Sequence, residues 1–381
     1  MPSPDLDTPP LKYRRTLLAL AGAMGFTMYG LGFCVPLLKH DLGISRATAS
    51  LHNLGFALMI TLTSFWLPSL ITRYSPRKVM LTGWIVAIAS LLTFTIGRSL
   101  WITVPAMSIA GLGATLFNNT NAVSIGQSSG MSIQVMLRQT GIATVSGAIS
   151  PSIIGFLIRQ GISWRVTLAA FALIFGAIAL KTMPAIPDRS PLRHRGTGRH
   201  WDKSLLILVG LGFTASGLEV TTGSWALDLL ISRGMLLSVA VVAVTVVSYG
   251  IGLSRLGLAM TSRLGVATMW WGSAALTATG LLMIVLGNSS TVTMFGLIIA
   301  AIGIGPLSAL ALAIAAISPK GADAGIAANV IGAGPVIGIG SWVIGIVSDT
   351  SGFSIAYLIP VVLLVLASGF FLATQDKSST T

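Results

Sequence analysis

Long apolar runs, each separated from the next by a short polar or basic gap, make up most of this chain. There are twelve such runs, and each reaches the length of about 20 residues that an α-helix needs to cross the hydrocarbon core of a bilayer. The pattern therefore predicts an all-α membrane protein with twelve transmembrane helices. Their expected bounds are 15–38, 47–71, 78–97, 101–126, 135–158, 164–183, 204–231, 236–258, 266–287, 291–317, 324–347 and 353–374.

The longest gap between runs reads AIPDRSPLRHRGTGRHWDK. It is too polar to be buried in a membrane, and it divides the helices into two sets of six. We therefore expect five parts along the chain. They are a cytoplasmic tail (1–14), a first six-helix bundle (15–184), a basic cytoplasmic linker (185–203), a second six-helix bundle (204–374) and a second cytoplasmic tail (375–381).

The distribution of lysine and arginine predicts how the helices are oriented. With both termini on one side, that side collects 17 of the 23 basic residues and the other side collects 6. Cytoplasmic loops of membrane proteins are enriched in lysine and arginine, so the larger set marks the cytoplasmic side. We expect a multi-pass protein of the cytoplasmic (inner) membrane with both termini in the cytoplasm.

Composition supports this interpretation. Only 9% of the residues are charged, and the mean hydropathy of +0.87 exceeds that of soluble domains. The formal net charge of +13 follows from the basic cytoplasmic gaps, so the expected surroundings are a lipid bilayer and no nucleic-acid partner is expected. The sequence lacks the spacing motifs of metal sites, hydrolases and phosphate loops. It therefore predicts no cofactor, no metal and no enzymatic activity.

The two halves resemble each other in sequence. The basic turn that contains Arg73 has a counterpart around Arg263 in the second half, and GAISPSIIG around Pro151 has a counterpart, GAGPVIGIG, around Pro335. The two counterparts follow their originals at similar offsets along the chain. Both proline segments place proline among small residues, which permits close helix contacts. The sequence thus predicts two pseudo-symmetric bundles related by a parallel repeat, with Pro151 and Pro335 as conformational positions.

The segment LITRYSPRK, residues 70–78, resembles the signature between helices 2 and 3 of the major facilitator superfamily, although Thr72 replaces its aspartate and Ser75 its glycine. The resemblance extends over almost the whole chain. It implies the major facilitator fold, alternating access, and a central cavity lined chiefly by helices 1, 2, 4, 5, 7, 8, 10 and 11. It also implies a cytoplasmic gate, whose expected residues are Arg73, Arg77, Lys78 and Arg263.

The seventh helix carries a softer resemblance. Gly217-Leu218-Glu219 with Trp225 is similar to helix 7 of the fucose-permease-like sugar transporters. The proton-linked acids that this branch carries in helices 1 and 4 have no counterpart here, which argues against a sugar substrate.

Glu219 is the one acid among ten that is expected deep in the membrane. It lies about 21 Å along its helix from Leu205, where an ionised side chain costs on the order of 3 kcal/mol. Helical spacing places it with Ser216 and Thr222 on a small and polar face. The residues expected to face lipid are Leu211, Leu218, Trp225 and Leu229. Two roles stay open for Glu219: proton coupling or recognition of a cation, and a purely structural hydrogen bond.

Other polar side chains are weaker candidates for the cavity. In the fourth helix we expect either Asn118 with Asn121, or Asn119 alone, to point inward. Their amides would contact substrate or join helices. Further candidates for substrate or proton binding are Tyr29, His52, Thr222 and Asn329, with an interfacial position as the alternative for His52.

Two arginines lie near the predicted cytoplasmic ends of their helices. Arg138 begins the fifth helix and Arg255 ends the eighth. Both side chains are long enough to extend to the interface. We therefore expect them to act in a gate or as anchors.

These residues together predict a secondary active transporter. The chain has no ATP-binding motif, so a gradient should drive transport, and a proton is the simplest coupling ion for a single deep carboxylate, with facilitated diffusion left open. We expect uptake of a small organic solute by a monomer. Proton-driven efflux of a drug-like or metabolite compound is the alternative, and a non-transporting receptor or an intramembrane enzyme is a remote one.

Overall fold

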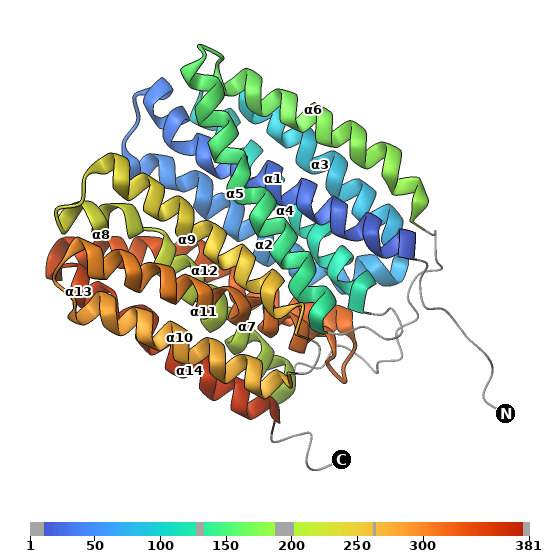
Figure 1. The fold of residues 1–381 in the computed structure, drawn as a ribbon. Helices are drawn as coiled ribbons and strands as arrows, with labels where there is room; N and C mark the ends of the chain where they lie inside the picture. Colours follow the sequence, from blue (N-terminus) through green and yellow to red (C-terminus); the bar gives the residue numbers. More distant parts are fainter. Residues whose placement is uncertain (1–10, 127–132, 187–201, 262–263, 376–381) are drawn as a thin grey trace.

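The computed structural model describes residues 11–126, 133–186, 202–261 and 264–375, and these ranges contain helices and no strands (Figure 1). The first half holds α1 (Leu11–Leu42), α2 (Arg46–Arg73), α3 (Pro76–Ile96), α4 (Leu100–Gly126), α5 (Ile133–Arg159), α6 (Trp164–Thr182) and the short 3-10 helix η1 (Met183–Ala185). The second half holds α7 (Lys203–Gly223), α8 (Ala226–Ser232), α9 (Leu237–Leu258), α10 (Val266–Leu286), α11 (Ser290–Ala316), α12 (Ala322–Ser351), α13 (Phe353–Ala356) and α14 (Leu358–Gln375).

Twelve helical spans within these ranges are long and apolar enough to cross a membrane. This confirms the predicted fold class, and most predicted helices begin and end within a few residues of the observed ones. The predicted linker at 185–203 and the two predicted tails lie largely outside the described residues.

Two predicted helices are each broken once. The run 204–231 is divided at Trp225 into α7 and α8, and the run 353–374 is divided at Tyr357 into α13 and α14. Hydrophobic periodicity does not reveal these breaks, because the residues on both sides of each break are apolar.

Side chains from the two breaks hold the ends of the helices in place. The Tyr357 hydroxyl donates a 3.0 Å hydrogen bond to the carbonyl oxygen of Thr222 in the last turn of α7. The Trp225 indole donates a 2.6 Å bond to the carbonyl oxygen of Ser341 on α12. A backbone carbonyl at the broken end of α7 is thereby satisfied inside the protein, as an apolar surrounding requires.

The spans form two bundles that lie side by side (Figure 1). In the first bundle α3 packs on α4 and α1 packs on α5, and the corresponding pairs of the second bundle are α10 with α11 and α7 with α12. Between the bundles, α2 packs against α12 and α5 packs against α9.

Close helix contacts recur at equivalent positions of the two halves. A Cβ atom on Gly113 of α4 would lie 2.5 Å from the backbone nitrogen of Ala87 on α3. On α11, a Cβ atom on Gly303 would lie 2.5 Å from the backbone nitrogen of Thr277 on α10. The offset in sequence from Gly113 to Gly303 equals the offset from Ala87 to Thr277. The predicted parallel repeat is therefore confirmed in individual contacts.

An arginine also caps the third membrane helix of each half. Arg165, which is paired with Asp41 at 3.2 Å, donates a 2.8 Å hydrogen bond to the carbonyl oxygen of Gly97 after α3. Arg233 donates to the carbonyl oxygen of Gly287 after α10. The two glycines are related by the same offset as the close contacts, although the arginines come from different elements. The cation in each half lies at the negative end of a helix dipole.

The bundles share a buried core at one end of the molecule, the end where α1 begins and α14 ends, which we call the basic end (Figure 1). There Val123 and Met136 of the first bundle belong to one hydrophobic cluster with Ala316 and Ile326 of the second. Toward the opposite end, the buried side chains described for α1, α4 and α6 form a cluster of first-bundle residues only. The bundles therefore close against each other at the basic end.

The lipid-facing side predicted for α7 is wrong. Leu211, Leu218 and Leu229 are fully buried, because this segment packs against α11, α12 and α14. The exposed large side chains of α7 are instead Leu206 and Phe213. The error has a simple cause: a central helix carries apolar side chains toward its neighbours as well as toward lipid.

Candidate functional site

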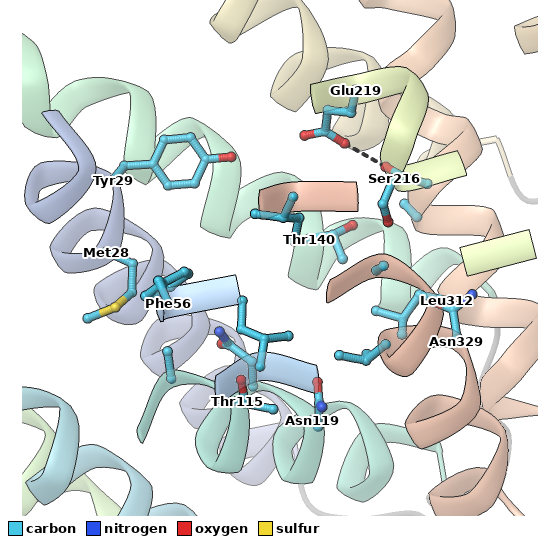
Figure 2. Close-up of a pocket in the computed structure, with 18 of the residues that line it drawn as sticks. Met28, Tyr29, Phe56, Thr115, Asn119, Thr140, Ser216, Glu219, Leu312 and Asn329 are labelled. Atoms are coloured by element: carbon cyan, nitrogen blue, oxygen red, sulfur yellow. Dashed lines mark hydrogen bonds between the residues drawn. The ribbon is translucent and has the colours of Figure 1, made fainter. Parts of the chain in front are cut away.

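A cavity of about 460 Å³ lies between the two bundles (Figure 2). Residues of α1, α2, α4, α5, α7, α9, α11 and α12 line it. Counted as membrane spans, these are helices 1, 2, 4, 5, 7, 8, 10 and 11, the set that the sequence resemblance implies. Apolar side chains share the wall with hydroxyl, amide and charged side chains.

Glu219 forms an ion pair at the wall of this cavity. Its Oε2 atom lies 2.5 Å from Nη2 of Arg255 on α9 and accepts a 2.8 Å hydrogen bond from the Ser308 hydroxyl on α11. The Glu219 side chain is 23% exposed and the Arg255 side chain 7%. The carboxylate is therefore the more accessible member of the pair.

The guanidinium of Arg255 is held by three further acceptors. Its Nε atom donates to the carbonyl oxygen of Gly305 at 2.7 Å, and Nη2 donates to Ser308 at 2.7 Å. Its Nη1 atom donates to the Thr144 hydroxyl of α5 at 2.5 Å. Because Thr144 belongs to the first bundle and the other partners to the second, Arg255 is a polar link between the bundles.

The expectation that Arg255 extends to the membrane interface is wrong. Its side chain turns inward, and its partner Thr144 lies eleven residues inside α5, about 16 Å from the start of that helix. The helix α9 thus ends short of the basic ends of its neighbours. An arginine near the end of its own apolar run is therefore deep in the molecule.

Two of the three asparagines in α4 line the cavity. Asn118 and Asn119 both contribute to the wall, and Nδ2 of Asn119 donates a 3.4 Å hydrogen bond to Ser64 of α2. Asn121 instead donates a 3.1 Å bond to the carbonyl oxygen of Leu17 on α1. The predicted groupings, Asn118 with Asn121 or Asn119 alone, are therefore wrong, because the cavity is wide enough to border two consecutive positions of one helix.

Tyr29 and Asn329 also line the cavity, as expected. Figure 2 shows the Tyr29 ring pointing into the space from α1, with Asn329 across the cavity on α12. The Tyr29 ring packs directly on Gly147 of α5. Asn329 is only 4% exposed, and its Nδ2 atom has no hydrogen-bond partner. Asn329 therefore has a buried donor without an acceptor at the edge of the cavity.

Two predicted site residues lie away from the cavity. His52 is fully buried, with Nδ1 2.9 Å from the carbonyl oxygen of Ala49 and Nε2 2.9 Å from the hydroxyl of Thr103 on α4. Its partner Thr103 lies in the first turn of α4, and the interfacial position of His52 stays a prediction. Thr222 is 3% exposed and does not line the cavity. Three residues along α7 from Glu219, its side chain is rotated by about 60° around the helix axis, and this takes it out of the cavity wall.

The predicted gate residues lie at the basic end where they are described. Arg73 ends α2 and is exposed, with its guanidinium 5.6 Å from the ring centre of Tyr74, and Arg77 and Lys78 lie in the first turn of α3. Arg138 is exposed on α5. Arg263 lies outside the described residues. The gate role of these side chains stays a prediction.

The two prolines predicted as conformational positions lie inside long helices. Pro151 is part of α5 and Pro335 of α12, and both are half-buried. These helices take part in the contacts between bundles, and the conformational role of the prolines stays a prediction.

Sequence reasoning missed several hydroxyl groups of the cavity, among them Thr115, Thr140 and Ser308. Serine and threonine are common in apolar helices, where they bond to their own backbone, so composition does not distinguish a cavity hydroxyl. Ser216 also lines the cavity, and its place on the Glu219 face was the signal that could identify it.

Comparison with known proteins decides the family. A model of the Major Facilitator Superfamily matches residues 17–327. The chain belongs to this superfamily. It is therefore a multi-pass membrane transporter, as the partial loop signature predicted.

Solved transporters share the fold at low sequence identity. FucP in the outward conformation superposes with a TM-score of 0.73 at 14% identity, covering 94% of this chain and 98% of that one. The proton:xylose symporter XylE gives 0.76 at 14% identity, covering 95% of each chain. The human organic anion transporter MFSD10 gives 0.73 at 15% identity, covering 96% of this chain and 100% of that one. At these identities the likeness establishes the fold alone.

One relative is similar in sequence. A chloramphenicol resistance protein of Streptomyces lividans is 29% identical over 178 residues, which are 45% of this chain and 44% of that protein. The similarity thus spans less than half of the relative.

Proposed function

We propose that this superfamily member is a proton-coupled secondary active transporter that takes up a small organic solute, with Glu219 as the proton-binding residue. The observation that carries the proposal is the ion pair of Glu219 with Arg255 at the wall of the central cavity. A carboxylate that is both accessible and charge-paired can change its protonation state and, with it, the partner it holds.

Protonation removes the charge that attracts Arg255. A proton that enters from the cavity binds the carboxylate of Glu219, and the ion pair with Nη2 of Arg255 becomes a weaker bond between the cationic guanidinium and a neutral carboxyl group. The guanidinium keeps its bonds to Gly305, Thr144 and Ser308. It therefore stays in position with an unbalanced positive charge.

The same pair supplies a route to the conformational change. Arg255 contacts Thr144 in the first bundle and Glu219 in the second. Alternating access requires two arrangements of the bundles, each open to one side of the membrane. A ligand or a proton that alters these bonds binds the two arrangements with different free energies, and this difference is what couples binding to the conformational change.

Orientation in the membrane completes the proposal. The distribution of basic residues supports a cytoplasmic location for the basic end and for both termini, in the cytoplasmic membrane. The bundles close against each other at that end, which supports an arrangement in which the cavity is reached from the outside. Protons from a more acidic exterior then load Glu219 first, which favours uptake. The proposed transporter acts as a monomer.

Efflux is the second candidate. The partial similarity to a chloramphenicol resistance protein favours it, and the amides of Asn118, Asn119 and Asn329 suit a neutral polar compound. The direction of substrate movement along an imposed pH gradient separates the two functions.

The test uses a solute identified by thermal stabilisation from a panel of sugars, organic acids, amino acids and cationic drugs. Protein reconstituted in liposomes is given an acidic exterior, and the internal solute is measured. We expect wild type to accumulate it and Glu219→Gln to equilibrate it without accumulation. Asp228→Asn, an exposed acid of α8, is the matched control and should accumulate like wild type. Unchanged accumulation by Glu219→Gln defeats the proposal.

A further inference from the structure

We infer that the transported solute is a small organic monoanion, a carboxylate with a compact apolar body, which binds Arg255 in place of the Glu219 carboxylate. The inference rests on the proposed role of Glu219 as the proton-binding residue.

The first observation is the set of partners around Arg255. Gly305, Thr144 and Ser308 are neutral acceptors, and Glu219 is the one charged partner described for this guanidinium. When Glu219 is protonated, the cavity wall carries one uncompensated positive charge. A planar guanidinium fixed by several bonds is a preorganised receptor for a carboxylate, which it can bind through two parallel hydrogen bonds.

The second observation is the unpartnered donor across the cavity. Nδ2 of Asn329 is buried and has no hydrogen-bond partner, although Asn329 lines the cavity. A buried polar group without a partner is energetically unfavourable. A second oxygen on the solute would supply the missing acceptor and orient the bound molecule between α9 and α12.

The third observation is a set of apolar side chains from both bundles in the cavity wall. The side chains that would contact the body of the solute are Met28, Phe56, Ile60, Leu312, Val330 and Ile337. They come from both bundles, so an apolar body can contact the two halves at once. Polar groups of a solute that face these six side chains would be left unpaired, so the part of the solute in contact with them should be apolar.

The charges in the cavity wall indicate the net charge of the solute. The ion pair contributes one carboxylate and one guanidinium to the cavity wall, which is neutral as a pair. With Glu219 protonated and one monoanion on Arg255, the site is neutral again. A cation would leave net positive charge and a dianion net negative charge, and a buried unbalanced charge is costly in a membrane protein. The geometry therefore implies one proton per anion and electroneutral transport.

The test measures ligand binding to the purified full chain in detergent. The probes are benzoate, benzamide and benzylamine, together with hexanoate, hexanamide and hexylamine, so that each carboxylate has a neutral and a cationic analogue of similar shape. We expect the carboxylates to raise the melting temperature by at least about 2 °C and their analogues to have no effect. Carboxylates that stabilise no better than the amides or amines overturn the inference.

Variants and pH distinguish the anion site from proton coupling. Benzoate should bind wild type at least about tenfold more weakly near pH 8 than near pH 6, because binding of the anion is linked to the uptake of a proton by Glu219. Glu219→Gln should bind benzoate with an affinity that does not depend on pH. Arg255→Gln should lose the response, and Arg255→Lys, which retains the charge, should keep part of it even if Arg255→Gln does not fold.

The failures of the two proposals have different signatures. Benzoate binding of equal strength at both pH values in wild type supports the anion site and defeats proton coupling through Glu219. Amides that bind as well as carboxylates, while accumulation stays sensitive to Glu219→Gln, defeat the anion site and leave the coupling intact.

Discussion

Arg255 and Glu219 are 36 residues apart in the chain and lie on different helices, yet Nη2 of the arginine lies 2.5 Å from Oε2 of the glutamate at the wall of the central cavity. The pair joins the deep acid of α7 to a basic residue near the end of α9. Through Thr144 on α5, it also joins the second bundle to the first.

Removing one member of this pair should destabilise the protein more than removing both. Arg255→Gln leaves the Glu219 carboxylate without its cation, and breaking a buried ion pair costs about 3–5 kcal/mol. We expect the double variant Glu219→Gln with Arg255→Gln to recover at least about 1 kcal/mol of that loss, because no charge is left unpaired. Thermal unfolding in detergent measures both. A double variant less stable than Arg255→Gln alone would contradict an energetically coupled pair.

Loss of the hydrogen bond at the broken end of α7 should lower the stability of the protein. Tyr357→Phe removes the donor to the carbonyl oxygen of Thr222, and a buried carbonyl without its partner costs about 1–3 kcal/mol. The melting temperature should fall by a few degrees, whereas Tyr74→Phe, which removes a hydroxyl from a half-exposed ring, should leave it unchanged. Equal melting temperatures for the two variants would show that the bond adds no stability.

The repeat predicts matched effects at two glycines. Gly113→Ala and Gly303→Ala each place a methyl group 2.5 Å from a backbone nitrogen of the facing helix. We expect each to destabilise by about 1–3 kcal/mol, because the tightly packed helices must separate. Gly272→Ala is the control, since its Cβ has no neighbour within 4 Å. A large loss at one glycine and none at the other would argue against equivalent packing in the two halves.

An ion pair at the basic end should make the stability of the protein depend on pH. Lys320 lies 2.8 Å from Asp202, and together with the Ser204 hydroxyl it holds the pKa of Asp202 well below its ordinary value. A lowered pKa in the folded state means that the pair stabilises at neutral pH and that this contribution is lost as the pH falls below about 4.

Because both side chains of this pair are partly exposed, we expect Lys320→Ala to cost less than about 1 kcal/mol near pH 7. The difference from wild type should shrink toward pH 3. Melting temperatures of both proteins across this range measure it, and a difference that grows on acidification would reverse the predicted sign.

Much of the fold follows from the sequence because the bilayer imposes a strong constraint. A helix that crosses the membrane must be long and apolar, so the spans, the even helix count and the repeat around Arg73 and Pro151 are visible as patterns. The breaks at Trp225 and Tyr357 are not visible, because they depend on single hydrogen bonds to other helices.

The site is predictable only in part, for a related reason. Glu219 stands out because a carboxylate is rare in an apolar run, and Tyr29, Asn118 and Asn329 lie on helices that line the cavity. The position of Arg255 depends on how far α9 extends relative to its neighbours, and the roles of Asn121 and His52 depend on which helix lies opposite. The extent of α9 and the identity of the facing helix are properties of helix packing, which the sequence of one helix does not determine alone.

Proton uptake on ligand binding tests coupling through Glu219 most directly. Purified protein in weakly buffered detergent near neutral pH is mixed with saturating benzoate, and the change in pH is recorded with a sensitive electrode or indicator dye. Coupling through this carboxylate predicts that wild type takes up about one proton per bound anion and that Glu219→Gln binds the anion without taking up a proton. Equal proton uptake by wild type and Glu219→Gln would contradict it.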